Sequence, residues 1–369
     1  MENIETFTTS DTSATSVVAD RIMAQIVRVV DLKPIAGADR IELALVLGWQ
    51  VIVQKGQFQI GDLAIYFNIG SVLDPTHPIT ATLAANLNNK PLKTIKMRKV
   101  LSQGLLTPIT SITPINNFHE KVFIEDEDVT QLLNVRKYVE PEEGNLYTGS
   151  QDASRCSWPI LIPKTDEPRL QNCPKVLNEI FDNEIVITQK YDGTSTTFLT
   201  LNNKFSVCSR NNLILDSVDN ITNNNNRVYL EMAKKYNLPE KMLKLNKNLA
   251  IQGETIGSKI NGNKHAVQEN SFYAFNVYDI DLQMYLSWDE VVTICHDLGL
   301  NVVPVIYRGL CVLNSVNAFL ELADKQVYST KSICEGIVVK TNNTNDKNNT
   351  INRISFKVIS NQYLLKYKL

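Results

Sequence analysis

Short apolar runs separated by turn-forming residues constrain the fold of this chain more than any other feature. Between Arg21 and Ile109 the runs read "RIMAQIVRVVDL", "GWQVIVQ" and "LAIYFNIG", and the turns between them read "IAGADR" and "KGQFQIGD". The stretch "KTIKMRKVLSQGLLTPI" predicts a further pair of strands. Several short strands with turns between them are typical of a small β-barrel or a β-sandwich.

A chain of 369 residues is long enough for about two domains. The segment "PEEGNLYTGSQDASRCSW" at 141–158 is rich in turn formers and predicts the boundary between them. We expect a disordered tail over 1–18, a β-rich domain over 19–140, a linker over 141–158 and a second domain over 159–369. Within the first domain, "DVTQLLNVRKYVE" predicts a closing helix from Asp128 to Glu140, with Asp128 as its N-cap.

The second domain mixes strands with a few helices, which predicts an α+β fold. Two helices are expected, at "RVYLEMAKKYN" and at "SWDEVVTICHDLGL", where Ser287 and Glu290 form a capping box and Gly299 ends the helix. The strands "TSTTFLTL" and "FSVCSR" predict a hairpin that turns at Asn202–Lys204. Further strands are expected at "EIVITQ", "LAIQGETIG", "SFYAFNVYDI", "EGIVVK" and "ISFKVIS".

Composition excludes several classes of protein. The net charge of −2 gives no global signal for nucleic acid, so any such surface would be a local patch. The six cysteines are scattered without a C-x-x-C pair, and the four histidines are dispersed, so we expect reduced thiols and no zinc site. We find no signal peptide and no apolar run long enough to span a membrane, and we expect a cytosolic or nuclear protein.

Charged side chains stand at the ends of the predicted strands of the second domain. Lys190 and Asp192 lie in "KYDG", and the hairpin returns Arg210 to the mouth of that loop. Other charged groups end or begin later strands: Glu254, Glu335, Lys340 and Lys357. One site is therefore predicted to hold all of these side chains.

Lysine nucleophilic catalysis on a nucleotide is the chemistry that this set favours. A free lysine is protonated at neutral pH, so we expect neighbouring cations to lower the pKa of Lys190 and free its amine. Three carboxylates, those of Asp192, Glu254 and Glu335, offer the oxygen ligands that hydrated Mg²⁺ prefers. Taken without its neighbours, Lys190 is better explained as a solvated lysine in a turn.

Six motifs occur in the order found in the covalent nucleotidyltransferase superfamily, which the chain resembles. They are K-x-D-G at Lys190–Gly193, S-R-N at Ser209–Asn211, G-E at Gly253–Glu254, the aromatic strand Phe272–Tyr278, E-G-I-V-V-K at Glu335–Lys340 and S-F-K at Ser355–Lys357. DNA ligases and capping enzymes of this superfamily carry an OB domain after the last motif, but only 12 residues follow Lys357.

The β-rich module that comes first resembles the N-terminal OB module of ATP-dependent RNA ligases of the Deinococcus and Naegleria type. The phrases "WPILIPKTDEPRLQN" and "SFKVISNQYLLKY" resemble the same family, and the resemblance extends over residues 20–369. It implies an OB-like β-barrel followed by a nucleotidyltransferase domain, rich in antiparallel sheet and ATP-grasp-like.

The resemblance also implies a role for each motif residue. Lys190 would be adenylylated by ATP, and the three carboxylates would bind Mg²⁺ or Mn²⁺ through waters. Other residues would contact the nucleotide: Arg210 the ribose or phosphate of AMP, Glu254 the ribose, Phe275 the adenine, Lys340 and Lys357 the α-phosphate, and Arg169 the pyrophosphate. Core packing is an alternative for Phe275, and a linker salt bridge for Arg169. Gln189, also expected in the ATP site, replaces the usual glutamate, and Ser355 replaces the first of two usual lysines.

The function implied is that of an RNA ligase sealing 5′-phosphate and 3′-hydroxyl ends through a lysyl-AMP intermediate. We expect a monomer whose partner is RNA or a nicked duplex with RNA on the 3′-hydroxyl side. The segment "NNKPLKTIKMRK" offers a basic surface for it, although a plain scaffold role remains open. Its cations are Lys90, Lys93, Lys96, Arg98 and Lys99. The alternatives are a capping-type guanylyltransferase and a nucleic-acid-binding protein with a degenerate transferase domain.

Overall fold

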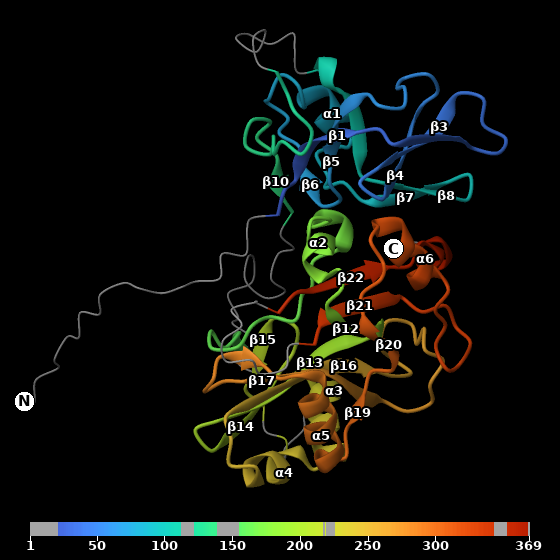
Figure 1. Cartoon of the computed structure of the whole chain (residues 1–369). Helices are drawn as coiled ribbons and strands as arrows, with labels where there is room; N and C mark the ends of the chain where they lie inside the picture. The colour runs from blue at the N-terminus through green and yellow to red at the C-terminus, as the bar shows by residue number, and fades with distance from the viewer. Residues whose placement is uncertain are drawn as a thin grey trace, which may run out of the picture.

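The computed structural model describes residues 21–111, 122–138, 155–216, 218, 226–342 and 353–367. Figure 1 shows an N-terminal domain above a larger C-terminal domain. The predicted tail over 1–18 and the predicted linker up to residue 154 lie outside the described residues. No helix in these ranges is long and apolar enough to cross a membrane.

The N-terminal domain consists of short antiparallel strands wrapped around two apolar cores. The strands are β1 (Ala24–Arg28), β2 (Asp31–Pro34), β3 (Ile41–Val46), β4 (Trp49–Gln54), β5 (Leu63–Phe67), β6 (Ser71–Val72), β7 (Thr94–Met97), β8 (Val100–Gln103) and β9 (Leu105–Pro108). β1, β5 and β9 form one sheet and β2, β3 and β4 another, while β4 lies beside β8 and β9 and so links the sheets. Trp49 and Tyr66 fill the core between them. The helix α1 (Ala81–Asn86) and a 3-10 turn at Ile109–Ser111 complete the domain.

The predicted helix at Asp128–Glu140 is wrong over its described part. The chain makes a tight turn there and then a strand, β10 (Arg136–Lys137), that pairs with β6. The carboxylate of Asp128 accepts from the Thr130 N–H, and Asn134 closes the turn with a φ of 47°. One turn buries Val129 and Leu133 without a helix, since the Thr130 hydroxyl accepts the backbone N–H groups of Met23 and Ala24. Pairing with β1 and β6 therefore outweighs the helical spacing of the apolar residues.

The C-terminal domain contains two antiparallel-rich sheets that meet near Lys190. The larger sheet runs β11-β15-β14-β13-β16-β17-β18, with β19 on β17, and the smaller runs β20-β12-β21-β22. The larger contains β11 (Arg155–Ser157), β13 (Thr194–Leu201), β14 (Lys204–Cys208), β15 (Asn212–Ile214), β16 (Leu249–Ile256), β17 (Ser271–Asp279), β18 (Met284–Tyr285) and β19 (Asn301–Val302). The smaller contains β12 (Glu184–Lys190), β20 (Val305–Leu310), β21 (Gly336–Thr341) and β22 (Ser355–Ile359).

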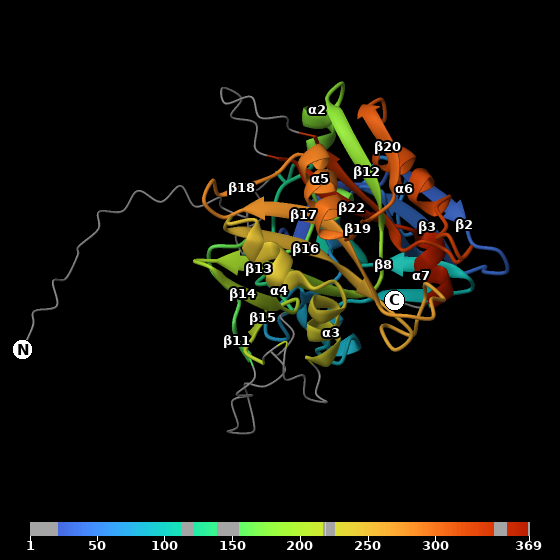
Figure 2. The same cartoon turned by 90° about the horizontal axis from the view of Figure 1, so that it is seen from below.

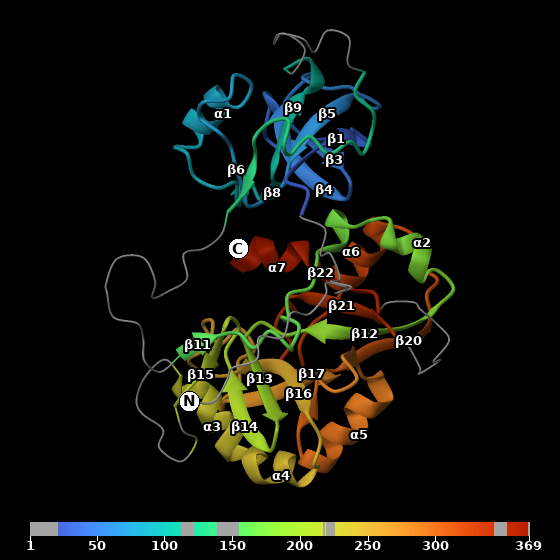
Figure 3. The same ribbon diagram turned by 90° about the vertical axis from the view of Figure 1, so that its left-hand side faces the viewer.

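Helices cover the outer faces of these sheets. α3 (Arg227–Lys235), α4 (Leu238–Lys244) and α5 (Trp288–Leu298) lie on the larger sheet (Figure 2) and share its core. α6 (Val316–Asp324) packs on the smaller sheet, with the short helix α2 (Val176–Ile180) and the 3-10 turn Leu170–Asn172 beside it. α7 (Asn361–Tyr367) lies between the two domains (Figure 3).

Several local predictions are confirmed. The β13–β14 hairpin turns at Asn202 and Asn203, whose φ angles of 50° and 59° suit a type I′ turn. α5 opens with the predicted capping box, in which Ser287 and Glu290 bond to each other's backbone N–H, and ends at left-handed Gly299. All six cysteines are free thiols. The sequence did not predict α6, α7 or β20.

Candidate active site

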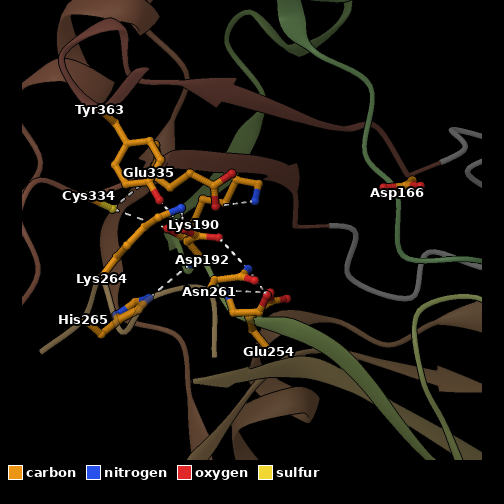
Figure 4. A network of polar contacts seen from close by, with 12 residues as sticks. Asp166, Lys190, Asp192, Glu254, Asn261, Lys264, His265, Cys334, Glu335 and Tyr363 are labelled. Carbon is orange, nitrogen blue, oxygen red and sulfur yellow. Dashed lines mark hydrogen bonds and ion pairs between the residues drawn. The ribbon is translucent and has the colours of Figure 1, made fainter. Parts of the chain in front are cut away.

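Strand register brings Lys190 to the place where the two sheets meet. Lys190 ends β12 and pairs with Gly336 at the start of β21, so Glu335 lies next to it. The Lys190 Nζ is 2.6 Å from the Glu335 Oε2, and both side chains are largely buried. On the other side, β13 and β16 pair so that Glu254 accepts the Gly193 N–H at 2.9 Å. Figure 4 shows the lysine and these carboxylates converging.

Three side chains from two separate segments hold the backbone of the Lys190–Gly193 loop. The Tyr328 hydroxyl donates to the Lys190 carbonyl at 3.0 Å, and the Asp192 N–H donates to the His265 Nε2 at 3.1 Å. The Asn261 amide donates to the Gly193 carbonyl at 2.6 Å. A Cβ on Gly193 would lie 2.2 Å from the Thr255 carbonyl oxygen, so the loop passes too close to β16 for a larger residue. The loop is therefore rigidly placed before any ligand binds.

Asp192 is the most heavily contacted carboxylate of the site. It accepts from Lys264 Nζ at 2.6 Å, from Asn261 at 3.0 Å and from the Tyr363 hydroxyl. Burial raises the pKa of Asp192, but the bonds from Lys264 and Tyr363 outweigh burial and lower it. Asp192 is thus anionic and ready to attract a cation.

The charges around Lys190 correct one expectation. Burial lowers its pKa, but the carboxylates of Glu335 and Glu254 outweigh burial, so the pKa is raised rather than lowered. The predicted cations do not free the amine in this state, because Arg210 pairs with Asp166 and Lys340 bonds elsewhere. Burial raises the pKa of Glu254 to about 7, because the Lys190 charge, which lowers this pKa, only partly offsets the effect of burial.

Two further predicted cations, Lys357 and Arg210, differ in where they lie: Lys357 is near Lys190, and Arg210 is beside Asp166. Burial first, and then the Lys190 charge, lower the pKa of Lys357 to about 8. Arg210 donates to both oxygens of Asp166 at 3.0 and 3.1 Å. Burial raises the pKa of Asp166, but Arg210, Lys357 and Lys190 together lower it. Arg210 thus lies after the hairpin and pairs with Asp166, which stands apart from Lys190 in Figure 4.

Lys340, Gln189 and Phe275 take other positions. Lys340 is 6% exposed and donates to the Phe275 carbonyl at 2.6 Å and to the Asn276 Oδ1 at 2.8 Å. Gln189 donates to the Val327 carbonyl at 2.9 Å rather than pointing to Lys190. Phe275 is half-buried beside the core of the larger sheet. The structure does not bring Lys340 and Gln189 together with the Lys190 ammonium.

A cavity of about 400 Å³ opens between the domains beside Glu335. Arg169 and Lys93 line it from opposite domains, with Thr94 and Tyr363 also in its wall. The Arg169 guanidinium lies 5.6 Å from the centre of the Trp49 ring, and its backbone bridges to Lys357. Arg169 thereby forms part of the cavity wall beside Glu335.

The other cations of the predicted basic segment lie on the β7–β8 hairpin of the N-terminal domain. Lys93, Lys96, Arg98 and Lys99 are all exposed. Lys96 donates to the Leu365 carbonyl in α7, and Arg98 donates to the Gly37 carbonyl. The hairpin therefore borders the interdomain cavity with its charges facing solvent.

The carboxylates suit a metal held through water better than one held directly. Within the described ranges no three His, Cys, Asp or Glu side chains lie close enough to hold an ion. Asp192, Glu254 and Glu335 nevertheless surround the lysine with oxygen atoms alone, the donor type that Mg²⁺ and Mn²⁺ accept. The residues present thus fit a hydrated divalent ion.

The contacting residues that were not predicted as part of the site include Asp166, Asn261, Lys264, His265, Tyr328 and Tyr363. His265 was treated as an isolated histidine, but it accepts a hydrogen bond from the Asp192 N–H. Its burial lowers its pKa to about 4, which keeps the ring neutral. The "NGNKH" run that carries Asn261, Lys264 and His265 was the available signal, lying directly after Glu254 and its strand.

Comparison with known proteins agrees with this geometry. The RNA ligase family model matches residues 183–359, and an OB-fold domain model matches residues 23–109. No curated protein sequence matches significantly.

Solved structures of the Naegleria gruberi RNA ligase are similar to this chain over almost their whole length. A lysine-to-alanine mutant with ATP and manganese is 28% identical, with a TM-score of 0.72 over 94% of this chain and 99% of that one. The same ligase with pyrophosphate is 29% identical, with a TM-score of 0.71 over the same shares. A glutamate-to-alanine mutant with AMP and manganese is 28% identical and gives a TM-score of 0.73, again over 94% and 99% of the two chains.

Proposed function

The chain belongs to the RNA ligase family, and we propose that it is an ATP-dependent RNA ligase whose nucleophile is Lys190. The observation that carries this assignment is the contact of the Lys190 ammonium with Glu335 at 2.6 Å, inside a ring of carboxylates at the meeting edge of two sheets. The similar ligase structures with ATP, AMP and pyrophosphate support ATP as the substrate. The N-terminal OB fold supports nucleic acid as the partner.

The reaction proceeds in three transfers. The Lys190 ammonium loses a proton, and the resulting amine attacks the α-phosphorus of ATP. A nitrogen–phosphorus bond forms and pyrophosphate leaves. A 5′-phosphate oxygen then attacks the same phosphorus, and Lys190 leaves and recovers its proton. Finally a 3′-hydroxyl attacks the activated 5′-phosphate, a phosphodiester forms and AMP leaves.

Residues around Lys190 divide the work of the first transfer. Glu335 accepts the hydrogen bond of the Lys190 ammonium and lies within reach to receive its proton. Lys357 places positive charge near Lys190 for the α-phosphate, Arg210, now paired with Asp166, would contact the ribose, and Phe275 would stack on the base. Arg169 faces the cavity where the leaving pyrophosphate would lie. Burial makes the charges of Lys357 and Arg169 act more strongly on the phosphates than they would in water.

A divalent ion would be held through waters by Asp192, Glu254 and Glu335. When bound, Mg²⁺ or Mn²⁺ supplies positive charge that offsets the negative charge of the phosphates. Lys264 now provides the positive charge closest to Asp192. The manganese in the similar ligase structures supports this choice of metal.

RNA would lie across both domains. Lys93 lines the cavity beside Glu335, and the exposed cations Lys96, Arg98 and Lys99 follow it along the β7–β8 hairpin, so a strand that contacts them would lead toward Lys190. The free thiols support an intracellular setting.

A labelling experiment tests the assignment. The protein is incubated with a divalent metal and α-labelled ATP or GTP, and label on the denatured protein is measured. We expect label from ATP that disappears in Lys190→Ala. Label from GTP alone would instead indicate a capping-type guanylyltransferase, and absence of label from either would indicate a binding protein without activity. Nicked duplexes with RNA or DNA at the 3′-hydroxyl then identify the substrate.

A further inference from the structure

Lys340 points away from the nucleophile although both residues belong to paired strands. Gly336 pairs with Lys190, whereas Lys340 pairs with Val186, four residues further along β12. Four residues of strand span roughly 13 Å. The Lys340 Nζ turns toward β17 in the other sheet, where it donates to the Phe275 carbonyl at 2.6 Å. Its place is therefore beside the predicted base site, not beside the Lys190 amine.

Phe275 occupies a bulge in β17. Gly253 of β16 pairs with Ala274 and Gln252 pairs with Asn276, so Phe275 is the extra residue without a partner. A bulge re-aims the side chain that it carries and recurs next to active sites. The Lys340 ammonium bonds the carbonyl of this extra residue and lies 5.4 Å from the centre of its ring.

A chain of buried amides extends this support. Asn276 accepts from Lys340 at 2.8 Å and from Arg353 at 2.7 Å through the same oxygen. Its amide nitrogen donates to Gln252 at 3.2 Å, and Gln252 donates to the Pro163 carbonyl at 2.8 Å. The network thus fixes the bulge from β16, from β21, from the segment just before β22 and from the segment that carries Pro163.

Burying Lys340 here is costly. The side chain is 6% exposed, and its two acceptors are a carbonyl and an amide oxygen, neither of which carries a full negative charge. A methionine would fill the same space without that cost. The ammonium is therefore best explained by what it positions.

We propose that Lys340 is a positioning residue that holds the Phe275 bulge in the conformation that stacks on the nucleotide base. This inference rests on the proposed ATP-dependent function. It differs from a phosphate contact, because the effect of Lys340 would be exerted through Phe275 and on nucleotide binding, not on the transfer of the phosphate.

Self-adenylylation at varied ATP concentration tests the proposal in wild type, Lys340→Met, Phe275→Ala and the double variant. We expect Lys340→Met to raise the half-saturating ATP concentration about tenfold, while the rate at saturating ATP stays within about threefold. Because both changes disturb one contact, the double variant should be little worse than Phe275→Ala alone. Thermal unfolding of each variant controls for folding.

Three results would overturn the proposal: a large fall in the saturating rate, effects of Lys340→Met and Phe275→Ala that multiply, or no effect of Lys340→Met. Should Lys340→Met fail to fold, Asn276→Ala removes one of the two acceptors and should give a smaller shift of the same kind. Labelling of wild type but not of Lys190→Ala preserves the proposed function whatever Lys340 does. An unlabelled wild type overturns both.

Discussion

At the scale of single residues, the site holds its nucleophile in the wrong protonation state for attack. Glu335 and Glu254 stabilise the Lys190 ammonium, and a cation is not a nucleophile. ATP and a divalent ion would bring both negative and positive charge to this place, so the amine becomes reactive only in the complete assembly. The arrangement favours storage of a charged lysine until the substrate arrives.

Lys357 gives a pH-dependent prediction. Its pKa of about 8 means that the ammonium is mostly present at pH 7 and mostly lost at pH 9. If its charge binds the α-phosphate, the half-saturating ATP concentration for self-adenylylation should rise up to about tenfold between these two pH values. Lys357→Arg keeps its charge throughout and should flatten this rise. A wild-type profile that stays flat would contradict the role of Lys357.

Tyr328 joins the nucleophile to its carboxylate partner. Its hydroxyl donates to the Lys190 carbonyl and accepts the Glu335 N–H, both at 3.0 Å. We expect Tyr328→Phe to slow self-adenylylation about tenfold, since each of these hydrogen bonds is worth about 1 kcal/mol. Tyr66→Phe is the matched control, because it removes a buried hydroxyl bond to Gln103 in the other domain. Equal rates in the two variants would show that the hydroxyl positions nothing.

The central residues of the site could be predicted from the sequence because they lie at or next to the ends of strands. Lys190, Glu254 and Glu335 follow directly from strand pairing once the strands are recognised. Lys264 and Tyr363 could not be found in this way, because their approach to Asp192 depends on the path of a loop and on the docking of α7. Charge spacing also could not reveal that Lys340 turns to the other sheet.

At the scale of elements, alternation and turn residues predicted most strands of both domains. The hairpin β13–β14 and helix α5 were found with their turn and cap because Asn-Asn and the Ser287–Glu290 pair act locally. The helix expected after Asp128 failed because the same apolar residues are buried by contacts with β1 and β6, which the local sequence does not encode.

The β7–β8 hairpin carries the prediction that belongs to this scale. Lys93 and Lys99 are exposed. Removing a lysine that neutralises one phosphate should make the plot of log binding constant against log salt concentration shallower by about 0.7 to 0.9. The variant Lys93→Ala/Lys99→Ala should therefore bind a nicked RNA duplex more weakly and with a shallower slope. Lys55→Ala removes an exposed lysine from the turn after β4 in the same domain and should leave binding unchanged. An unchanged slope in the double variant would assign the hairpin a scaffold role.

At the scale of the whole molecule, α7 connects the active site to the N-terminal domain. Its Tyr363 donates to Asp192, while Leu365 accepts from Lys96 of the β7–β8 hairpin. Leu364 packs against Leu101 of β8 in a small cluster with Ile359. A shift of one domain against the other would therefore disturb the Asp192 carboxylate.

Gly48 tests a second contact between the two domains, that of the β3–β4 turn with α6. It lies in the β3–β4 turn with a φ of 76°, and a Cβ there would meet Val316 of α6 at 2.4 Å. Gly56 has a φ of 77° but nothing within 4 Å, so Gly56→Ala suffers the same backbone strain of about 1 kcal/mol without the clash. We expect both variants to lose that stability in thermal unfolding, but only Gly48→Ala to separate the domains and slow RNA sealing. Limited proteolysis between the domains and sealing of a nicked duplex measure the difference. Equal behaviour of the two variants would mean that sealing does not depend on this contact, because strain alone would then explain both.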